Sequence, residues 1–128
     1  MRVWTLPAVA VGIMAATGFS DEPSEGAMRS AFQATLTADV RAALDFVAAT
    51  GGEAALAQVR AARTDAFDIR GFTKLACMPS PREAGHVCGF AVRIAVVTGE
   101  IDRTITGRFY QGPHGLEFIE QAPTPAGA

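Results

Sequence analysis

The chain has 128 residues, and its 11 lysines and arginines against 13 aspartates and glutamates give a formal net charge of −2. These charges are scattered along the chain, so the sequence lacks both the basic footprint of nucleic-acid binding and a polybasic segment that would seek a lipid surface. A chain of this length has room for one domain with a modest hydrophobic core.

The first twenty residues have the order of a secretory signal. Arg2 supplies a positive charge, an apolar run follows from Val3 to about Ala16, and a polar stretch begins after Gly18. Small residues stand where signal peptidase requires them, which predicts cleavage after residue 18 or residue 20. The alternative is an uncleaved anchor, but a membrane span needs about 20 apolar residues and this run is shorter. We therefore expect residues 1–20 to be removed, with no stable membrane insertion afterwards.

Residues 23–62 carry a helical pattern. Apolar residues recur there every three or four positions, at Met28, Phe32, Leu36, Val40, Leu44 and Val47. Gly51 and Gly52 then interrupt the pattern. We expect one long helix or two consecutive helices up to about Ala49, followed by a short helix over residues 53–62.

The hydrophobic period changes from 3.6 to 2 after the helical region. Alternating residues predict strands over residues 67–77, 86–97, 101–110 and 116–120, separated by loops rich in proline and glycine. The expected product is an α+β domain over residues 21–121, with the helices packed on one face of a four-stranded antiparallel meander. Residues 122–128, rich in proline, alanine and glycine, are expected to be a disordered tail.

The two cysteines are predicted to form a disulfide. Cysteines in a small exported chain usually pair, because the compartment is oxidising and a small core gains from a crosslink. Strand alternation also places Cys77 and Cys88 on the same inward face of neighbouring strands, as a disulfide requires. The alternative is a copper(I) or zinc site at Cys77, His86 and Cys88, but structural zinc sites normally show two close pairs of ligands. We expect no metal and no other cofactor.

No catalytic constellation is visible in the sequence. It contains neither a Gly-x-Ser-x-Gly elbow nor a Ser-x-x-Lys pair, and its two histidines, His86 and His114, lie beside turns. His86 is expected to be a solvated residue at the start of a strand. We therefore expect a non-catalytic domain rather than an enzyme.

Five residues are candidates for a binding surface. Phe72 and Tyr110, with the nearby loop that carries His114, could form an exposed recognition edge, because aromatic residues with a polar handle favour interfaces. Arg93 has an outward position in its strand. Arg103 has an inward position, where it could reach the sheet's edge, pair with a helix carboxylate or line a cavity.

The order of helices, meander and bridged first hairpin resembles cystatin-like and NTF2-like domains, in which an antiparallel sheet curls around a helix. The chain is also similar to small uncharacterised exported proteins of proteobacteria. These share a Gly-Gly after a helix, a Lys-x-x-Cys strand and a Val-Cys-x-Phe strand, found here at Gly51-Gly52, residues 74–77 and residues 87–90. This second resemblance implies export and no particular activity.

Cystatins present a Gln-x-Val-x-Gly hairpin to cysteine proteases. Residues 95–99, Ala-Val-Val-Thr-Gly, keep the valine and glycine spacing but lack the glutamine, and they follow the second strand rather than the first. We expect a periplasmic or secreted domain that binds an unknown protein or small ligand in the cell envelope. Inhibition of an exported hydrolase and an NTF2-like pocket enzyme are the alternatives.

Overall fold

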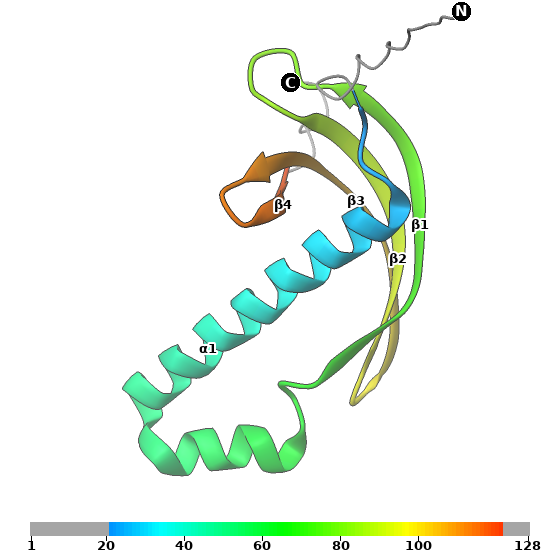
Figure 1. Cartoon of the computed structure of the whole chain (residues 1–128). Coiled ribbons are helices and arrows are strands. Elements are labelled where there is room, and N and C mark those ends of the chain that lie inside the picture. Colours follow the sequence, from blue (N-terminus) through cyan, green and yellow to red (C-terminus); the bar gives the residue numbers. More distant parts are fainter. Residues whose placement is uncertain (1–20, 122–128) are drawn as a thin grey trace, which may run out of the picture.

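The computed structural model describes residues 21–121. Its elements are α1 (Glu25–Ala62), β1 (Phe67–Pro79), β2 (His86–Val96), β3 (Gly99–Gly112) and β4 (Gly115–Glu120) (Figure 1). The four strands form one antiparallel sheet in chain order, with α1 on one face, so the predicted α+β meander is confirmed. The predicted signal over 1–20 and the predicted tail over 122–128 lie outside the described residues.

The start and the kink of α1 follow directly from its sequence. The Ser24 hydroxyl accepts a hydrogen bond of 3.1 Å from the backbone N–H of Ala27, which caps the first turn. Helical geometry is interrupted at Gly52, whose φ of 74° is readily available only to glycine. Residues 25–51 thus form one helical segment, and residues 53–62 form the short second segment that the sequence predicts.

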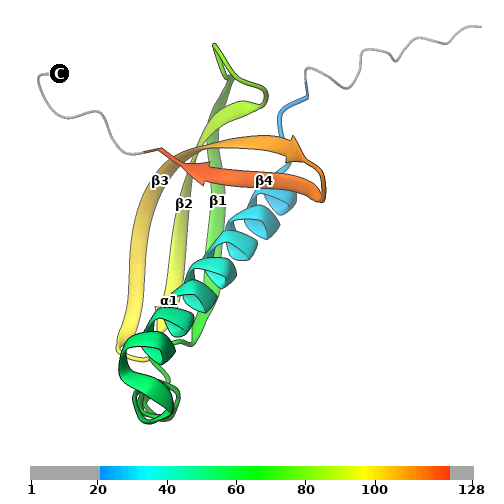
Figure 2. The same ribbon diagram turned by 90° about the vertical axis from the view of Figure 1, so that its left-hand side faces the viewer.

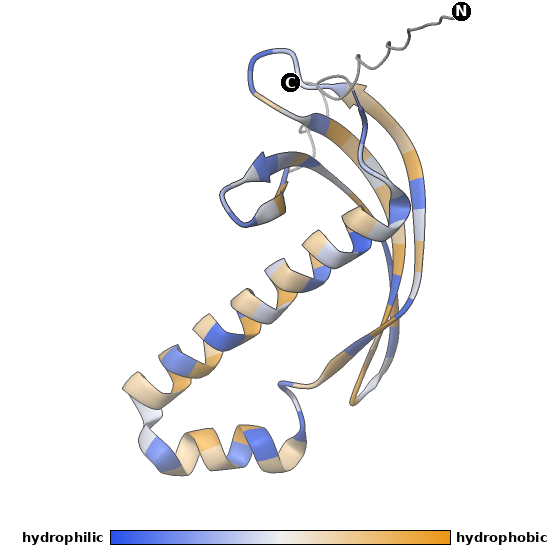
Figure 3. Cartoon of the chain, viewed as in Figure 1, coloured by the Kyte–Doolittle hydropathy of each residue, from blue (hydrophilic) through white to orange (hydrophobic). Residues whose placement is uncertain are grey.

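The sheet curls around the N-terminal half of α1. The C-terminal part of β3 bends so that it and β4 cross over the helix near its start (Figure 2). The helix contacts both edge strands: Arg29 donates a hydrogen bond of 2.7 Å to the carbonyl oxygen of Ile69 in β1, and the Thr35 hydroxyl lies 3.4 Å from that of Phe118 in β4. Farther along, α1 runs away from the sheet, although hydrophobic residues continue to its far end (Figure 3).

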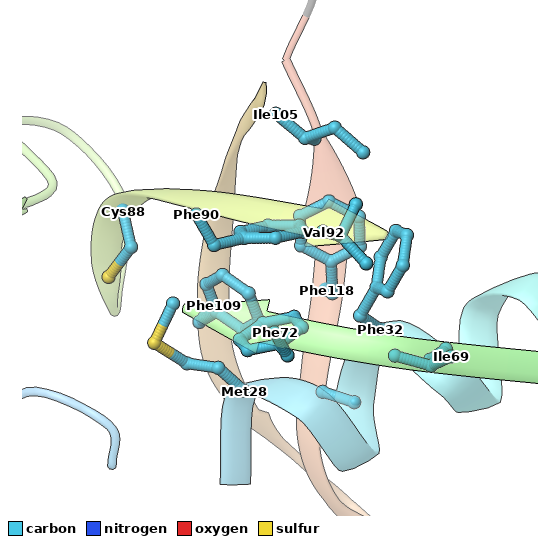
Figure 4. Close-up of a cluster of buried hydrophobic side chains, with 11 residues drawn as sticks. Met28, Phe32, Ile69, Phe72, Cys88, Phe90, Val92, Ile105, Phe109 and Phe118 are labelled. Carbon is cyan, nitrogen blue, oxygen red and sulfur yellow. The ribbon is translucent and has the colours of Figure 1, made fainter. Parts of the chain in front are cut away.

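Aromatic rings form the core between the start of α1 and the sheet. Phe90 in β2 is fully buried, and its ring centroid lies between 4.7 and 5.9 Å from those of Phe32, Phe72, Phe109 and Phe118 (Figure 4). Rings at these distances add favourable electrostatic contacts to the burial of apolar area. The core therefore joins α1 to β1, β2, β3 and β4.

Two β-bulges in β1 change which of its residues face the helix. One extra residue lies between Ile69 and Phe72, so Phe72 faces inward opposite Val92. Another lies between Lys74 and Cys77, and it returns Cys77 to the inner face. The prediction of an exposed Phe72 is wrong, because strict alternation does not anticipate a bulge; the residue is 9% exposed and belongs to the core.

Candidate functional site

Cys77 and Cys88 face each other on the inner side of β1 and β2 and form the predicted disulfide, with a sulfur–sulfur distance of 2.06 Å. Their Cα atoms lie 4.1 Å apart, near the close spacing of a non-hydrogen-bonded antiparallel pair. Both sulfurs are bonded to each other, so neither is a thiolate that could join His86 in holding a metal. Within residues 21–121, no group of three histidine, cysteine or acidic side chains is placed to hold a metal ion.

A pocket of about 640 Å³ lies at the end of the sheet where α1 begins. Its walls come from the segment before α1, the β1–β2 connection and the β3–β4 hairpin. Its polar lining residues are Asp21, Glu22, His86, Tyr110 and Gln111, and its apolar lining comes from Pro23, Ala27, Pro79, Ala84, Gly85, Phe109 and Leu116. Residues far apart in the sequence thus form one pocket, with both polar and apolar side chains in its lining.

His86 is the buried polar residue of this pocket. It is 9% exposed and lies on the inner face of the sheet, opposite Phe109. Within the described part of the chain its imidazole has no hydrogen-bond partner. The prediction of a solvated His86 is wrong, because the residue lies on the inner face of β2, in a pocket that the segment before α1 also lines. An unpartnered buried polar group costs about 1–3 kcal/mol, so an occupant that hydrogen-bonds it would relieve that cost.

Lys74 fixes the segment that forms the mouth of the pocket. Its Nζ lies 2.5 Å from a carboxylate oxygen of Glu22 and donates a hydrogen bond of 2.7 Å to the carbonyl oxygen of Pro23. The backbone N–H of Lys74 donates to the Glu25 carboxylate at 2.8 Å. The hydrogen bond from Lys74 lowers the pKa of Glu22, with smaller contributions from the charges of Lys74 and His86. Glu22 is therefore a carboxylate at neutral pH.

Tyr110 lines the pocket, so one of the predicted binding residues does belong to it. Its hydroxyl donates a hydrogen bond of 3.0 Å to Glu117 across β3 and β4, and this bond raises the pKa of Tyr110. The guanidinium carbon of Arg108 lies 4.5 Å from the centre of the ring. These two contacts hold the aromatic wall in place.

The other candidate residues lie elsewhere. Arg93 and Arg103 both line a shallow hollow of about 670 Å³ over β1, β2 and β3. Hydrogen bonding to Asp102 at 2.8 Å raises the pKa of Arg93, so its charge is already compensated. Arg103 stands opposite inward-facing Val92 in the register of β2 and β3, but it is exposed. His114 is exposed in the β3–β4 turn.

Sequence reasoning missed Glu22 and misplaced His86. The alternation His86, Cys88, Phe90, Val92 is a signal that puts His86 on the inner face, and all four residues are buried. Nothing local connects Glu22 with the pocket, because its place depends on a contact with Lys74 in a distant strand.

The side chains that line the pocket offer hydrogen bonds, negative charge and apolar contact. Among the residues of 21–121 that line it, none is a serine, threonine or cysteine. An imidazole can donate or accept a hydrogen bond, the carboxylates of Asp21 and Glu22 attract positive charge, and Phe109 with Leu116 offers apolar contact.

Comparison of the chain with protein-family models, with curated proteins and with solved structures finds no match. Among residues 21–121, no helix has the length and apolar character to cross a membrane. The functional proposal therefore depends on the chemistry of the pocket.

Proposed function

We propose that this protein is an exported, non-catalytic domain that binds a small molecule in the pocket lined by His86. The observation that carries the proposal is the imidazole of His86, nine-tenths buried in a cavity of about 640 Å³ and without a partner in the described residues. Small-molecule sites are typically half-closed apolar cavities of about 300–1,000 Å³ with a few polar groups that orient the ligand. A bound molecule would supply the hydrogen bond that the imidazole lacks.

Two features support export to the periplasm or the medium. The first is the apolar run that begins at Val3, which has the order of a cleavable signal. The second is the Cys77–Cys88 disulfide, a feature of proteins in oxidising compartments. The intact mass of protein recovered from the cell envelope should be that of residues 19–128 or 21–128 less two hydrogens. A full-length mass, or two thiols trapped by alkylation, would contradict export.

Ligand binding can be tested by a fragment screen on isotope-labelled protein purified from the envelope, with amide NMR shifts as the readout. Binding fragments should shift residues around the pocket, including His86, Tyr110 and Leu116. The variant His86→Leu should lose these shifts, whereas Arg103→Ala, outside the pocket, should keep them. A screen whose hits all map to the hollow at Arg93 and Arg103, or that yields none, would overturn the proposal.

A second candidate function is inhibition of an exported hydrolase, as the cystatin-like resemblance suggests. The β2–β3 hairpin favours it, because Val97 and Ile101 at its tip are 53% and 46% exposed. Exposed apolar side chains on a protruding turn suit insertion into a partner's cleft. Purified protein should then slow a papain-like protease or a lysozyme, and Val97→Asp should abolish the effect. Unchanged rates across both enzyme classes would exclude this function.

A further inference from the structure

We infer that the ligand of the His86 pocket is a small organic cation: an ammonium group carried on an apolar body. This inference depends on the proposed function, since it names the chemical class of molecule that the pocket would hold. Three independent properties of the pocket point to it, namely its charge, its apolar walls and the position of its imidazole.

The acidic side chains at the mouth outnumber the lysine and arginine side chains in contact with them. Asp21 and Glu22 line the pocket, and none of the lining residues within 21–121 is a lysine or an arginine. Lys74, the nearest ammonium group, already contacts Glu22, and its backbone N–H is bound by Glu25. Asp21 and Glu22 thus bring two carboxylates to the mouth, where Lys74 compensates the charge of Glu22. A cation would be drawn to this mouth and an anion repelled.

Arg108, which lies next to the pocket, does not change the balance of charge at its mouth. The Arg108 guanidinium is held over the ring of Tyr110, lies 3.5 Å from a carboxylate oxygen of Glu83 and donates to the carbonyl oxygen of Ala84 at 2.9 Å. Its charge is thus engaged on β3 and the β1–β2 connection. On the other side of Tyr110, Glu117 accepts the phenolic hydrogen bond.

The interior of the pocket requires an apolar body and one hydrogen bond. Phe109, Leu116, Pro23 and Pro79 line it, and burial of a ligand's hydrocarbon against them is favourable. The unpartnered imidazole of His86 can accept a hydrogen bond from an ammonium N–H. A primary amine on a short aryl chain meets both requirements.

The inference is tested with three probes of similar shape: phenethylamine, phenethyl alcohol and 3-phenylpropionate, which are cationic, neutral and anionic. Binding is measured by calorimetry and by NMR shifts on the protein purified from the envelope. The amine should bind about tenfold more tightly than the alcohol, the carboxylate should bind most weakly, and added salt should weaken only the amine.

Two matched variants separate local from general charge effects. Asp21→Asn removes a carboxylate of the mouth and should weaken amine binding several-fold while leaving alcohol binding unchanged. Asp39→Asn makes the same change on the exposed part of α1, away from the pocket, and should change neither. Thermal unfolding of both variants checks that the fold is retained.

The outcomes distinguish this inference from the proposed function. If the alcohol or the carboxylate binds in the pocket as tightly as the amine, or if Asp21→Asn has no effect on the amine, the cationic class is overturned while small-molecule binding stands. If none of the three probes shifts residues that line the pocket, both are overturned.

Discussion

Phe72 stacks on Phe90, with ring centroids 4.7 Å apart and an interplanar angle of 18°. This contact exists because an extra residue in β1 turns Phe72 toward the helix, opposite Val92. Without the bulge, Phe72 would face the opposite side of the sheet, since side chains alternate along a strand. The bulge therefore adds an aromatic ring to the core that surrounds Phe90.

The centre of the aromatic core should be the most sensitive position in the domain. Phe90→Ala should lower the free energy of unfolding by about 3–5 kcal/mol, because it leaves a cavity among four contacting rings. The matched variant Phe46→Ala removes a ring that is 68% exposed and should change the stability by less than about 0.5 kcal/mol. Urea unfolding followed by circular dichroism measures both, and equal effects would contradict the described core.

Gly107 should not tolerate a side chain. A Cβ at this position would lie 2.1 Å from Cε1 of Phe118 and 2.7 Å from the carbonyl oxygen of Ile119. Gly107→Ala should destabilise the protein by about 1–3 kcal/mol, because the core must shift to admit the methyl group. Gly26→Ala, in the first turn of α1 with nothing within 4 Å, should be neutral or stabilising. A neutral Gly107→Ala would show that β3 and β4 pack less closely than described.

The disulfide should stabilise the domain measurably. Cysteines 11 residues apart close a short loop, and replacing both Cys77 and Cys88 by serine should lower the free energy of unfolding by about 3 kcal/mol. A reducing agent should shift the denaturation midpoint of the parent protein toward that of the double variant. The reducing agent should leave the denaturation midpoint of the double variant unchanged. A shift in that midpoint would show that the reducing agent acts in some way other than by cleaving the disulfide.

The ionisation of Tyr110 should report its bond to Glu117. Tyr110 is the only tyrosine in the chain, so absorbance at high pH follows this side chain alone. The hydrogen bond raises its pKa above the ordinary value of 10.0, so the bond stabilises the fold below pH 10 and the contribution is lost as pH rises through the folded value. Glu117→Ala should lower the midpoint of ionisation. An unchanged midpoint would mean that the two groups do not interact.

The contact between Glu22 and Lys74 should make the protein sensitive to acid. Because the pKa of Glu22 is lowered from 4.5 in the folded protein, its stabilising contribution is present above pH 4.5 and is lost as pH falls through the folded value. Thermal midpoints measured across this range should fall less steeply for Glu22→Gln than for the parent. Glu53→Gln changes an exposed residue on the second helical segment, and its thermal midpoint should depend on pH as that of the parent protein does. If the midpoint of Glu22→Gln also follows the parent protein, the contact between Glu22 and Lys74 is not formed.

The elements of this fold could be predicted because each carries a local signal. Period-2 alternation predicts the strands, the helical period predicts the helix, and the Gly51-Gly52 pair predicts its kink, each to within a few residues. The sequence could not predict in full which residues of β1 face the helix, because a bulge depends on the pairing of β1 with β2. Alternation places Cys77 on the inner face correctly only because the second bulge cancels the first.

The pocket was beyond prediction for a similar reason. Tyr110 could be identified by type, but its partner Glu117 belongs to the next strand. Glu22 lies at the mouth only because Lys74, on a strand beyond the whole of α1, holds it there. Contacts between residues distant in sequence form the site, whereas single-sequence patterns report mainly on neighbours.

The helix has a further consequence for the borders of the sheet. β1 and β4 are the edge strands, and such strands normally offer unpaired backbone groups to other chains. Here the Arg29 side chain donates a hydrogen bond to the carbonyl oxygen of Ile69, and the Glu25 carboxylate accepts one from the backbone N–H of Lys74. An intruding strand would find these positions already taken on β1. The same helix that buries the core thus obstructs the addition of a foreign strand along this stretch of β1.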